Sequence, residues 1–353
     1  MQLRKIVVAF AVALPLAGVA SGAFACASCG CSLNTDIGTQ GMGMAGGWTL
    51  DVRYDTLNQN KLRYGTKGIS QGQAANTTNG ATGGPAEVEG YTQNNYLTAS
   101  LDYNDGESWG VTGVLPYIMR NHSTFGTYDG SGDLPPTPGD GAYSSKTSGI
   151  GDMKIIGRYF GMAEQKDWGF QFGVKLPTGS RNQTGTLADG SGSIAVDPGL
   201  QAGTGSTDLI GGIYKFGLIN DSENWGYFAQ AQYQAAVMVQ SVPNSLVSSG
   251  ASAGGTYRPG NAANVNVGVN YQGLEKWVPT LQINVINKRA DSGTAADVWA
   301  TGGTLAYLTP GLLYRLTDQT QVYANVQLPV YQNVNGIQLV PSYIASMGVR
   351  VYF

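Results

Sequence analysis

The chain has 353 residues, of which only 12% are charged, and it contains 52 glycines and 20 tyrosines. Its formal net charge of −3 provides no basic surface for nucleic acid, so no nucleic-acid partner is expected. After residue 25, no stretch approaches the roughly 20 apolar residues of a membrane-spanning helix. Low charge with many glycines and tyrosines indicates a secreted β protein or an outer-membrane β-barrel.

Residues 1–25 have the three parts of a secretory signal peptide. A charged start, "MQLRK", precedes an apolar run, and Ala23-Phe24-Ala25 has the small-residue pattern of a cleavage site. Cleavage after Ala25 leaves Cys26 as the first mature residue. The sequence therefore predicts export, with residues 26–45 as a periplasmic tail.

This tail contains all three cysteines of the chain, Cys26, Cys29 and Cys31, in a CxxCxC arrangement. In an oxidising compartment the arrangement has three interpretations, which the sequence leaves open. Cys26 and Cys29 form a disulfide and leave Cys31 free, or the three thiolates bind a soft metal such as Cu(I) or Zn(II), or Cys26 is lipidated. The first two imply a periplasmic redox or metal-handling partner.

From residue 46 onward the chain alternates apolar and polar residues with the period of a β-strand. In "WGYFAQAQYQAAVMVQ", the aromatic and aliphatic residues share one face, and Gln230, Gln232 and Gln234 share the other. The polar face carries uncharged amides rather than the lysines and glutamates of a solvated sheet. Lipid outside and a polar lumen inside explain this inversion.

Twelve such segments are expected, and long and short connections alternate between them. An all-β fold is therefore predicted for residues 46–353: a transmembrane antiparallel up-and-down β-barrel of about twelve strands in the outer membrane of a Gram-negative bacterium. The alternation of connections places both termini in the periplasm. Terminal Phe353 resembles the signal that the barrel-assembly machinery recognises, so outer-membrane lipids and this machinery are expected partners. The segments are 46–56, 94–104, 108–118, 149–160, 168–178, 206–217, 225–240, 263–272, 278–288, 303–316, 320–331 and 342–353.

Five of the six tryptophans, Trp48, Trp109, Trp168, Trp225 and Trp277, each open an outgoing segment. Indole rings settle at the headgroup level of a bilayer, which predicts an aromatic girdle on the periplasmic side.

Strand parity places a set of charged side chains in the lumen, because a charge on the lipid face costs roughly 2–4 kcal/mol near the bilayer midplane. Two interpretations remain open: a packed ladder of paired Asp and Arg side chains that fills the interior, or a polar path that selects small solutes. The expected lumen residues are Asp51, Arg53, Asp102, Lys154, Arg158, Lys175 and Arg350.

No catalytic residue is predicted. His122, the one histidine of the chain, falls in a segment expected to be an outer loop, with Ser123 and Thr124 merely as chain neighbours. A Ser–His hydrolase needs a positioned serine and an orienting partner, so the chain is not expected to be an enzyme.

Residues 149–353 resemble the outer-membrane family named for the meta-pathway of phenol degradation. The motifs that carry the resemblance are Gly-Asp in "SGIGDMKIIGRYF", Leu-Pro-Thr-Gly in "WGFQFGVKLPTGS" and Gly-x-Gly-Ser-Thr-Asp in "LQAGTGSTDLIGG". The resemblance implies an outer-membrane channel, often proposed for hydrophobic or aromatic compounds, with these motifs as structural marks. The predicted function is thus a channel for small solutes, and the alternative is a non-conducting barrel that anchors a periplasmic partner through the cysteine tail.

Overall fold

The computed structural model describes residues 46–130, 133–219, 224–243 and 255–353. The predicted signal peptide and the cysteine tail, with Cys26, Cys29 and Cys31, lie outside these residues. Within the described part of the chain, no helix is long and apolar enough to cross a membrane.

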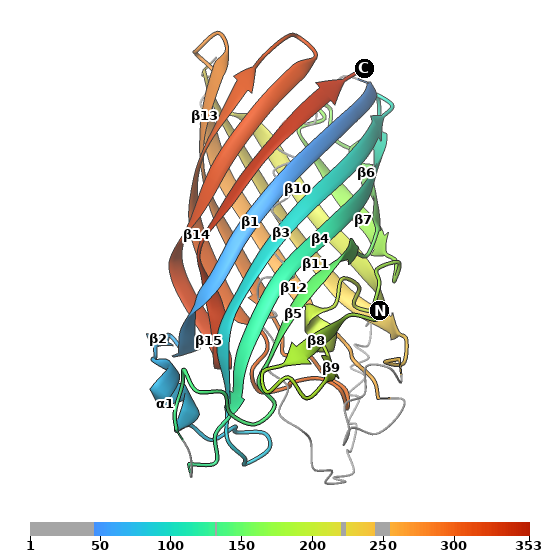
Figure 1. The fold of residues 1–353 in the computed structure, drawn as a ribbon. Helices are drawn as coiled ribbons and strands as arrows, with labels where there is room; N and C mark the ends of the chain where they lie inside the picture. The colour runs from blue at the N-terminus through green and yellow to red at the C-terminus, as the bar shows by residue number, and fades with distance from the viewer. Residues whose placement is uncertain (1–45, 131–132, 220–223, 244–254) are drawn as a thin grey trace, which may run out of the picture.

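One sheet of antiparallel strands makes up nearly the whole described structure (Figure 1). Its wall consists of β1 (Gly47–Gly65), β3 (Glu87–Asn104), β4 (Trp109–Thr127), β6 (Lys154–Tyr159), β7 (Trp168–Lys175), β10 (Ser206–Leu218), β11 (Trp225–Val239), β12 (Ala262–Tyr271), β13 (Trp277–Lys288), β14 (Gly303–Arg315) and β15 (Thr320–Tyr352). Shorter elements belong to the connections: β2 (Lys67–Gly68), α1 (Gln71–Ala75), β5 (Tyr143–Ile150), β8 (Thr184–Leu187), β9 (Ser193–Ala195) and the 3-10 turn η3 (Pro198–Leu200).

The sheet closes on itself, because β1 pairs with β15 on one side and with β3 on the other. Val334 of β15 pairs with Gly303, the first residue of β14, and with Gly65, the last residue of β1, so β14 and β1 run in opposite directions. Because β15 is antiparallel to both, it must reverse direction within its own length. Gly336, with φ of +54°, supplies the positive φ that a tight reversal needs. Counting β15 twice gives twelve passes through the wall, and the predicted antiparallel barrel of about twelve strands is confirmed.

Several strands are longer than the sequence pattern indicated. Elements β1, β3 and β4 extend into residues 57–93 and 119–148, which were expected to be loops. In β1 the register shifts between Leu57 and Lys61, so the alternation breaks although the strand continues. The expected strand 149–160 is divided between β5 and β6, and the expected loop 332–341 is part of β15.

The wall has an apolar outer face and a polar inner face. On β1, Leu50 and Val52 are exposed whereas Asp51 and Arg53 are buried, and the same alternation recurs around the ring. The pairing of β1 with β15 closes the ring of wall strands, which is what a β structure needs in lipid. Other exposed outward side chains include Leu97, Leu101, Leu115, Val265, Val267, Leu281, Ile283, Val326, Leu328 and Val349.

The end of the barrel that carries the C-terminus has short turns, and we call it the short-turn end. Backbone hydrogen bonds join Trp48 and Phe353 there, at 2.8 and 2.9 Å. Of the five tryptophans noted above, four are exposed; four are the first residue of a strand at this end, and Trp48 is the second residue of β1. Aromatic neighbours extend the belt: Trp48–Tyr103, Tyr103–Trp109, Trp168–Phe170, Trp225–Tyr271 and Trp277–Tyr314.

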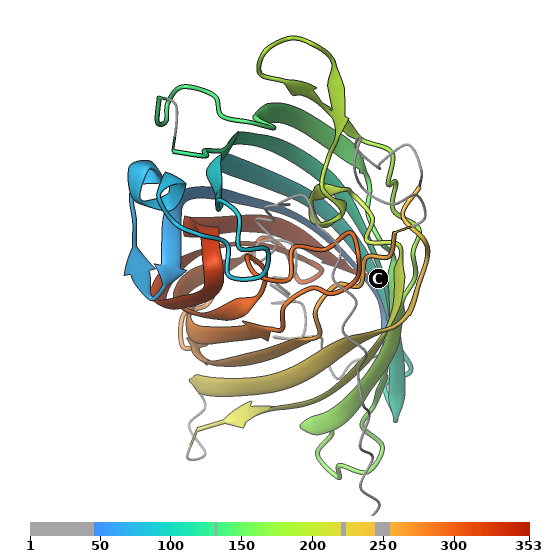
Figure 2. The ribbon, with the colours of Figure 1, turned by 90° about the horizontal axis from the view of Figure 1, so that it is seen from below.

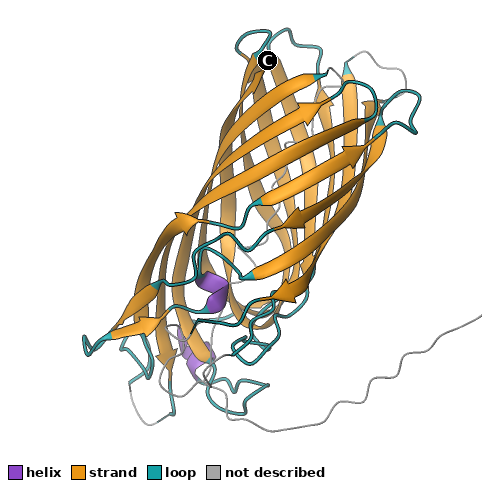
Figure 3. Cartoon of the chain, turned by 90° about the vertical axis from the view of Figure 1, so that its right-hand side faces the viewer, coloured by secondary structure: helices purple, strands orange, loops and turns teal. Residues whose placement is uncertain are grey.

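The opposite end carries the long connections, and we call it the long-loop end. The helical turns lie among these connections (Figure 3), and the view from this end shows loops lying across the opening of the ring (Figure 2). A cluster of buried apolar side chains holds them together. Its buried members are Leu62, Ala74, Ala75, Ala86, Val88, Tyr128, Tyr143, Val196, Leu200, Ile337 and Leu339.

Candidate functional site: the barrel interior

Three buried ion pairs line the inner wall. Arg350 Nε lies 3.1 Å from Asp51 Oδ2, where the two residues face each other across β1 and β15. Arg53 lies 2.9 Å from Asp55, and Arg158 lies 2.7 Å from Asp102. Five of the seven expected lumen residues are thus in paired, buried positions on the inner face, which neutralises their charges.

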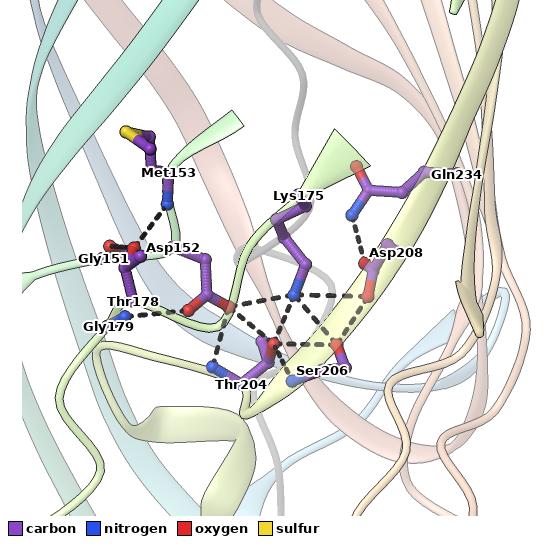
Figure 4. A network of polar contacts seen from close by, with 10 residues as sticks. All are labelled: Gly151, Asp152, Met153, Lys175, Thr178, Gly179, Thr204, Ser206, Asp208 and Gln234. Carbon is purple, nitrogen blue, oxygen red and sulfur yellow. Dashed lines mark hydrogen bonds and ion pairs between the residues drawn. The ribbon is translucent and has the colours of Figure 1, made fainter. Parts of the chain in front are cut away.

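Lys154 is half-buried at the start of β6. Lys175, the last residue of β7, is buried in a larger network (Figure 4). Its ammonium lies 2.9 Å from Asp152 and 3.4 Å from Asp208, and it also donates to Ser206 and Thr204.

The same network brings together the three family-like motifs. Asp152 belongs to Gly-Asp, and its Oδ1 accepts a hydrogen bond from Gly179 N of Leu-Pro-Thr-Gly at 3.0 Å. Its Oδ2 accepts from Thr204 N of the third motif, also at 3.0 Å. Three separate chain segments therefore meet around one lysine, where β5 and β6 separate and β7 ends. The interpretation of these motifs as structural marks fits this arrangement.

Uncharged amides cover another part of the inner wall. Asn284 donates to Asn266 at 2.7 Å, and Thr309 donates to Asn284 at 2.6 Å. Gln230 donates to Gln171 at 2.8 Å. Because each amide offers both a donor and an acceptor, neighbouring strands satisfy one another without charge.

The sequence pattern missed a group of buried polar residues nearer the long-loop end. The expectation that His122 lies in an outer loop is wrong: it lies in β4, is 1% exposed, and its Nδ1 is 2.9 Å from Thr92 Oγ1. Glu89 Oε2 lies 3.6 Å from the same nitrogen. Arg120, two residues before His122, donates to Asn94. The signal was present in the sequence, since residues 120, 122 and 124 continue the inward parity of β4 past residue 118.

Two loop carboxyls at the long-loop end, the buried Asp197 and the half-buried Asp297, have raised pKa values. Burial and the nearby Glu87 carboxylate raise the pKa of Asp197, which accepts a hydrogen bond from Tyr143 at 3.2 Å. Burial raises the pKa of Asp297 to about 6, although Trp299 N and Ala300 N both donate to its Oδ1 at 2.8 Å. Within the residues that the structure describes, no three His, Cys, Asp or Glu side chains are grouped to hold a metal ion.

A chamber of about 660 Å³ occupies the interior at the short-turn end. Its wall mixes aromatic and polar groups, among them Phe228, Tyr323, Gln282, Asn325 and Arg350, each less than one-tenth exposed. A side chain at Gly348 would collide with the Tyr323 ring, so a glycine there lets the ring lie against the wall. An apolar cluster packs among the loops of the long-loop end, whereas this chamber lies at the short-turn end.

One strip of this inner wall contains several buried polar atoms without a hydrogen-bond partner in the described structure. They are Arg350 Nη2, both amide atoms of Asn325, Gln327 Nε2, Ser346 Oγ and Asp55 Oδ1. Asp55 and Ser346 are paired across β1 and β15, and Asn325 and Gln327 are successive inward residues of β15. A buried polar atom without a partner costs free energy, and active or binding sites are where such atoms are expected.

Comparison with solved structures finds similar barrels. An outer membrane channel from Pseudomonas putida F1 is similar at 11% sequence identity with a TM-score of 0.58, over 88% of this chain and 96% of that chain. The β domain of the Bordetella autotransporter BrkA gives 13% identity and a TM-score of 0.46, over 88% of this chain and 100% of that chain. The monoaromatic hydrocarbon channel CymD gives 11% sequence identity and a TM-score of 0.43, over 94% of both chains.

Neither the comparison with family models nor that with curated proteins gave a match. At such low identity, the Pseudomonas channel shows a shared fold. The chain therefore has the fold of the outer-membrane β-barrels.

Proposed function

We propose that the chain is an outer-membrane channel for small solutes, with hydrophobic and aromatic compounds among them, and not an enzyme. The observation that carries this proposal is the chamber of about 660 Å³, whose wall offers aromatic faces and hydrogen-bonding groups together. Binding sites for small molecules combine an apolar lining with a few placed polar groups in this way. The similar Pseudomonas barrel, described as an outer membrane channel, supports the proposal.

In this proposal Asp51, Arg53, Asp102, Lys154, Arg158, Lys175 and Arg350 form the charged part of the solute path. Their pairing leaves little net charge, so the path is suited to neutral solutes or to solutes with a single charge. Both termini lie in the periplasm, with the exposed tryptophans of the short-turn end at the inner headgroup level. In this orientation the long-loop end faces the outside.

The apolar cluster at the long-loop end favours the alternative, a non-conducting barrel that anchors a periplasmic redox or metal-handling protein through its cysteine tail. Trp299, from the loop between β13 and β14, reaches Tyr64 of β1 at 6.0 Å between ring centroids. In a channel, this loop would be one of the segments that narrow the opening.

Swelling of liposomes that contain the purified protein distinguishes the two functions. For a channel, we expect small neutral solutes such as arabinose to enter faster than into protein-free liposomes, with rates that fall steeply as solute size increases. Swelling at the rate of protein-free liposomes for every solute would contradict the channel. A variant with residues 291–300 replaced by a short glycine-serine linker should swell faster than the wild type, because the loop that packs against β1 is removed.

A further inference from the structure

We propose that the chamber at the short-turn end contains a subsite for the carboxylate of a small aromatic acid, formed by Arg350 and Asn325. This inference rests on the proposed function, since it names a solute class for the same interior. It is carried by two side chains that line the chamber, are almost fully buried and have polar atoms without a hydrogen-bond partner in the described structure.

The Arg350 side chain is held in place by its Nε, whereas its Nη2 makes no hydrogen bond within the described structure. Its Nε donates to Asp51, and Tyr323 Oη donates to the other carboxylate oxygen of Asp51 at 2.9 Å. The guanidinium lies 5.6 Å from the centroid of the Tyr323 ring. Arg350 is 2% exposed and lines the chamber, and its Nη2 has no hydrogen-bond partner among the described residues. The structure thus presents a positioned N–H donor that carries part of a positive charge.

Asn325 supplies the second donor. It is 7% exposed, it lines the same chamber, and neither its Nδ2 nor its Oδ1 has a partner. Asn325 and Tyr323 are successive inward residues of β15, about 7 Å apart along a strand. Because the Arg350 guanidinium lies against the Tyr323 ring, Asn325 is on the same strip of the wall as Arg350. In the proposed subsite one carboxylate oxygen accepts from Arg350 and the other from Asn325.

The rest of the wall suits an aromatic ring. Phe228 and Tyr323 present ring surfaces, and Leu313 and Val278 complete an apolar surround. Arg315 lies on the same lining and donates to the backbone carbonyl of Glu275 at 3.2 Å. The carboxylate that lines the chamber, Asp167, has Lys215 as an ion-pair partner at 3.6 Å. The chamber therefore favours an anion over a cation.

Fluorine NMR titration of the purified full-length protein in a neutral detergent tests this subsite. The probes are 4-fluorobenzoate and 4-fluorobenzyl alcohol, which have similar size and differ in charge. We expect the benzoate to bind at least about tenfold more tightly, the usual effect of a hydrogen bond to a charged group. Equal dissociation constants for the two probes would overturn the proposal.

Paired substitutions separate the subsite from general effects of charge. In Asp51→Asn/Arg350→Gln both partners become neutral, so no buried charge is left alone, and the preference for benzoate should disappear. Asn325→Leu, which keeps the number and branching of the side-chain heavy atoms, should weaken benzoate binding several-fold. The matched control is Lys288→Gln/Asp291→Asn, a buried pair at 2.7 Å outside the chamber, which should keep wild-type binding. A preference that survives both chamber variants would overturn the subsite.

The titration and the liposome experiment fail independently. Binding in the predicted pattern without any swelling would contradict the channel and leave the subsite in place. Swelling without a preference for benzoate would contradict the subsite and leave the channel in place.

Discussion

Lys175 Nζ lies 2.9 Å from Asp152 Oδ2, and this contact joins the last residue of β7 to the short break between β5 and β6. Asp208 at the start of β10 completes the arrangement, with one oxygen 3.4 Å from the same ammonium. All three side chains are buried. A single ammonium thus lies between two carboxylates, near the point where β4 changes its partner from β5 to β6.

Replacing Lys175 by Met should destabilise the barrel strongly, because Asp152 and Asp208 remain buried without a cation. Breaking a buried ion pair by removing one partner costs roughly 3–5 kcal/mol. The measurement is the urea midpoint of unfolding, followed by the mobility of unboiled protein on gels.

Lys215→Met is the matched control, since Lys215 and Asp167 form a pair at 3.6 Å in which the lysine side chain is 54% exposed. Exposed pairs contribute about 0–1 kcal/mol, so this variant should unfold close to the wild-type midpoint. Equal midpoints for the two lysine variants would show that the Lys175 network does not stabilise the wall.

The loop that packs against β1 should loosen as pH rises, because burial raises the pKa of Asp297 from 3.8 to about 6. Between these values the folded loop binds the proton more tightly than the unfolded loop does. The stability of the folded loop therefore falls as pH rises from about 4 to 6. One pKa unit corresponds to about 1.4 kcal/mol, so the change is at most roughly 3 kcal/mol.

Asp297→Asn should remove this pH dependence while keeping an oxygen for the Trp299 and Ala300 amides. Hydrogen exchange of residues 289–302, corrected for the intrinsic effect of pH, is the measurement. The idea fails if the wild-type loop has the same protection at pH 4.5 and pH 7, or if the variant shows the same loss of protection as the wild type.

The sequence predicts the barrel well because the lipid imposes a regular alternation on the middle of each strand. Asp51 and Arg53 are assigned to the inner face by that alternation alone. Beyond the lipid band both faces become polar, so Arg120 and His122 lose the contrast that would mark them as part of a strand. The alternation pattern therefore predicts a loop for this segment.

The sequence pattern also does not specify which distant residues pair with each other. Asp51 and Arg350 are 299 positions apart, and they meet since the last strand closes on the first in one particular register. The Lys175 network depends on three connections whose positions the strand pattern does not specify. The sequence likewise does not show that the Asn325 amide lacks a hydrogen-bond partner, because this depends on which residues surround it in the folded barrel.

We expect the side chain of Phe353 to matter more for the assembly of the barrel in the outer membrane than for the stability of the folded barrel. Its backbone hydrogen bonds to Trp48 persist in Phe353→Ala, and the side chain is 63% exposed. We therefore expect less folded protein in the outer membrane but an unchanged urea midpoint for the fraction that folds. Tyr343→Ala, another exposed aromatic of β15, is the control and should assemble normally. Equal amounts of the two variants would contradict an assembly role of Phe353.

The chemistry of the predicted tail can be read from the intact mass of the exported protein. A Cys26–Cys29 disulfide predicts a mass two hydrogens below the reduced chain, with one thiol that reacts with an alkylating reagent. A soft-metal site predicts about one bound Cu or Zn that is lost in Cys29→Ser and at pH near 5, because thiolates must be deprotonated to bind. A diacylglyceryl group on Cys26 would contradict both. A mass that includes residues 1–25 would contradict the signal peptide.

Single-channel conductance in a planar bilayer is the most direct test of a solute path through this interior. The account predicts discrete conductance steps for the wild type, and smaller steps for Asn325→Trp, whose indole would occupy the chamber. Tyr343→Ala, an exposed aromatic of β15 outside the chamber, should keep the wild-type step size. A correctly folded barrel that inserts and remains silent at every voltage, with the loop 291–300 present or replaced, would contradict the channel.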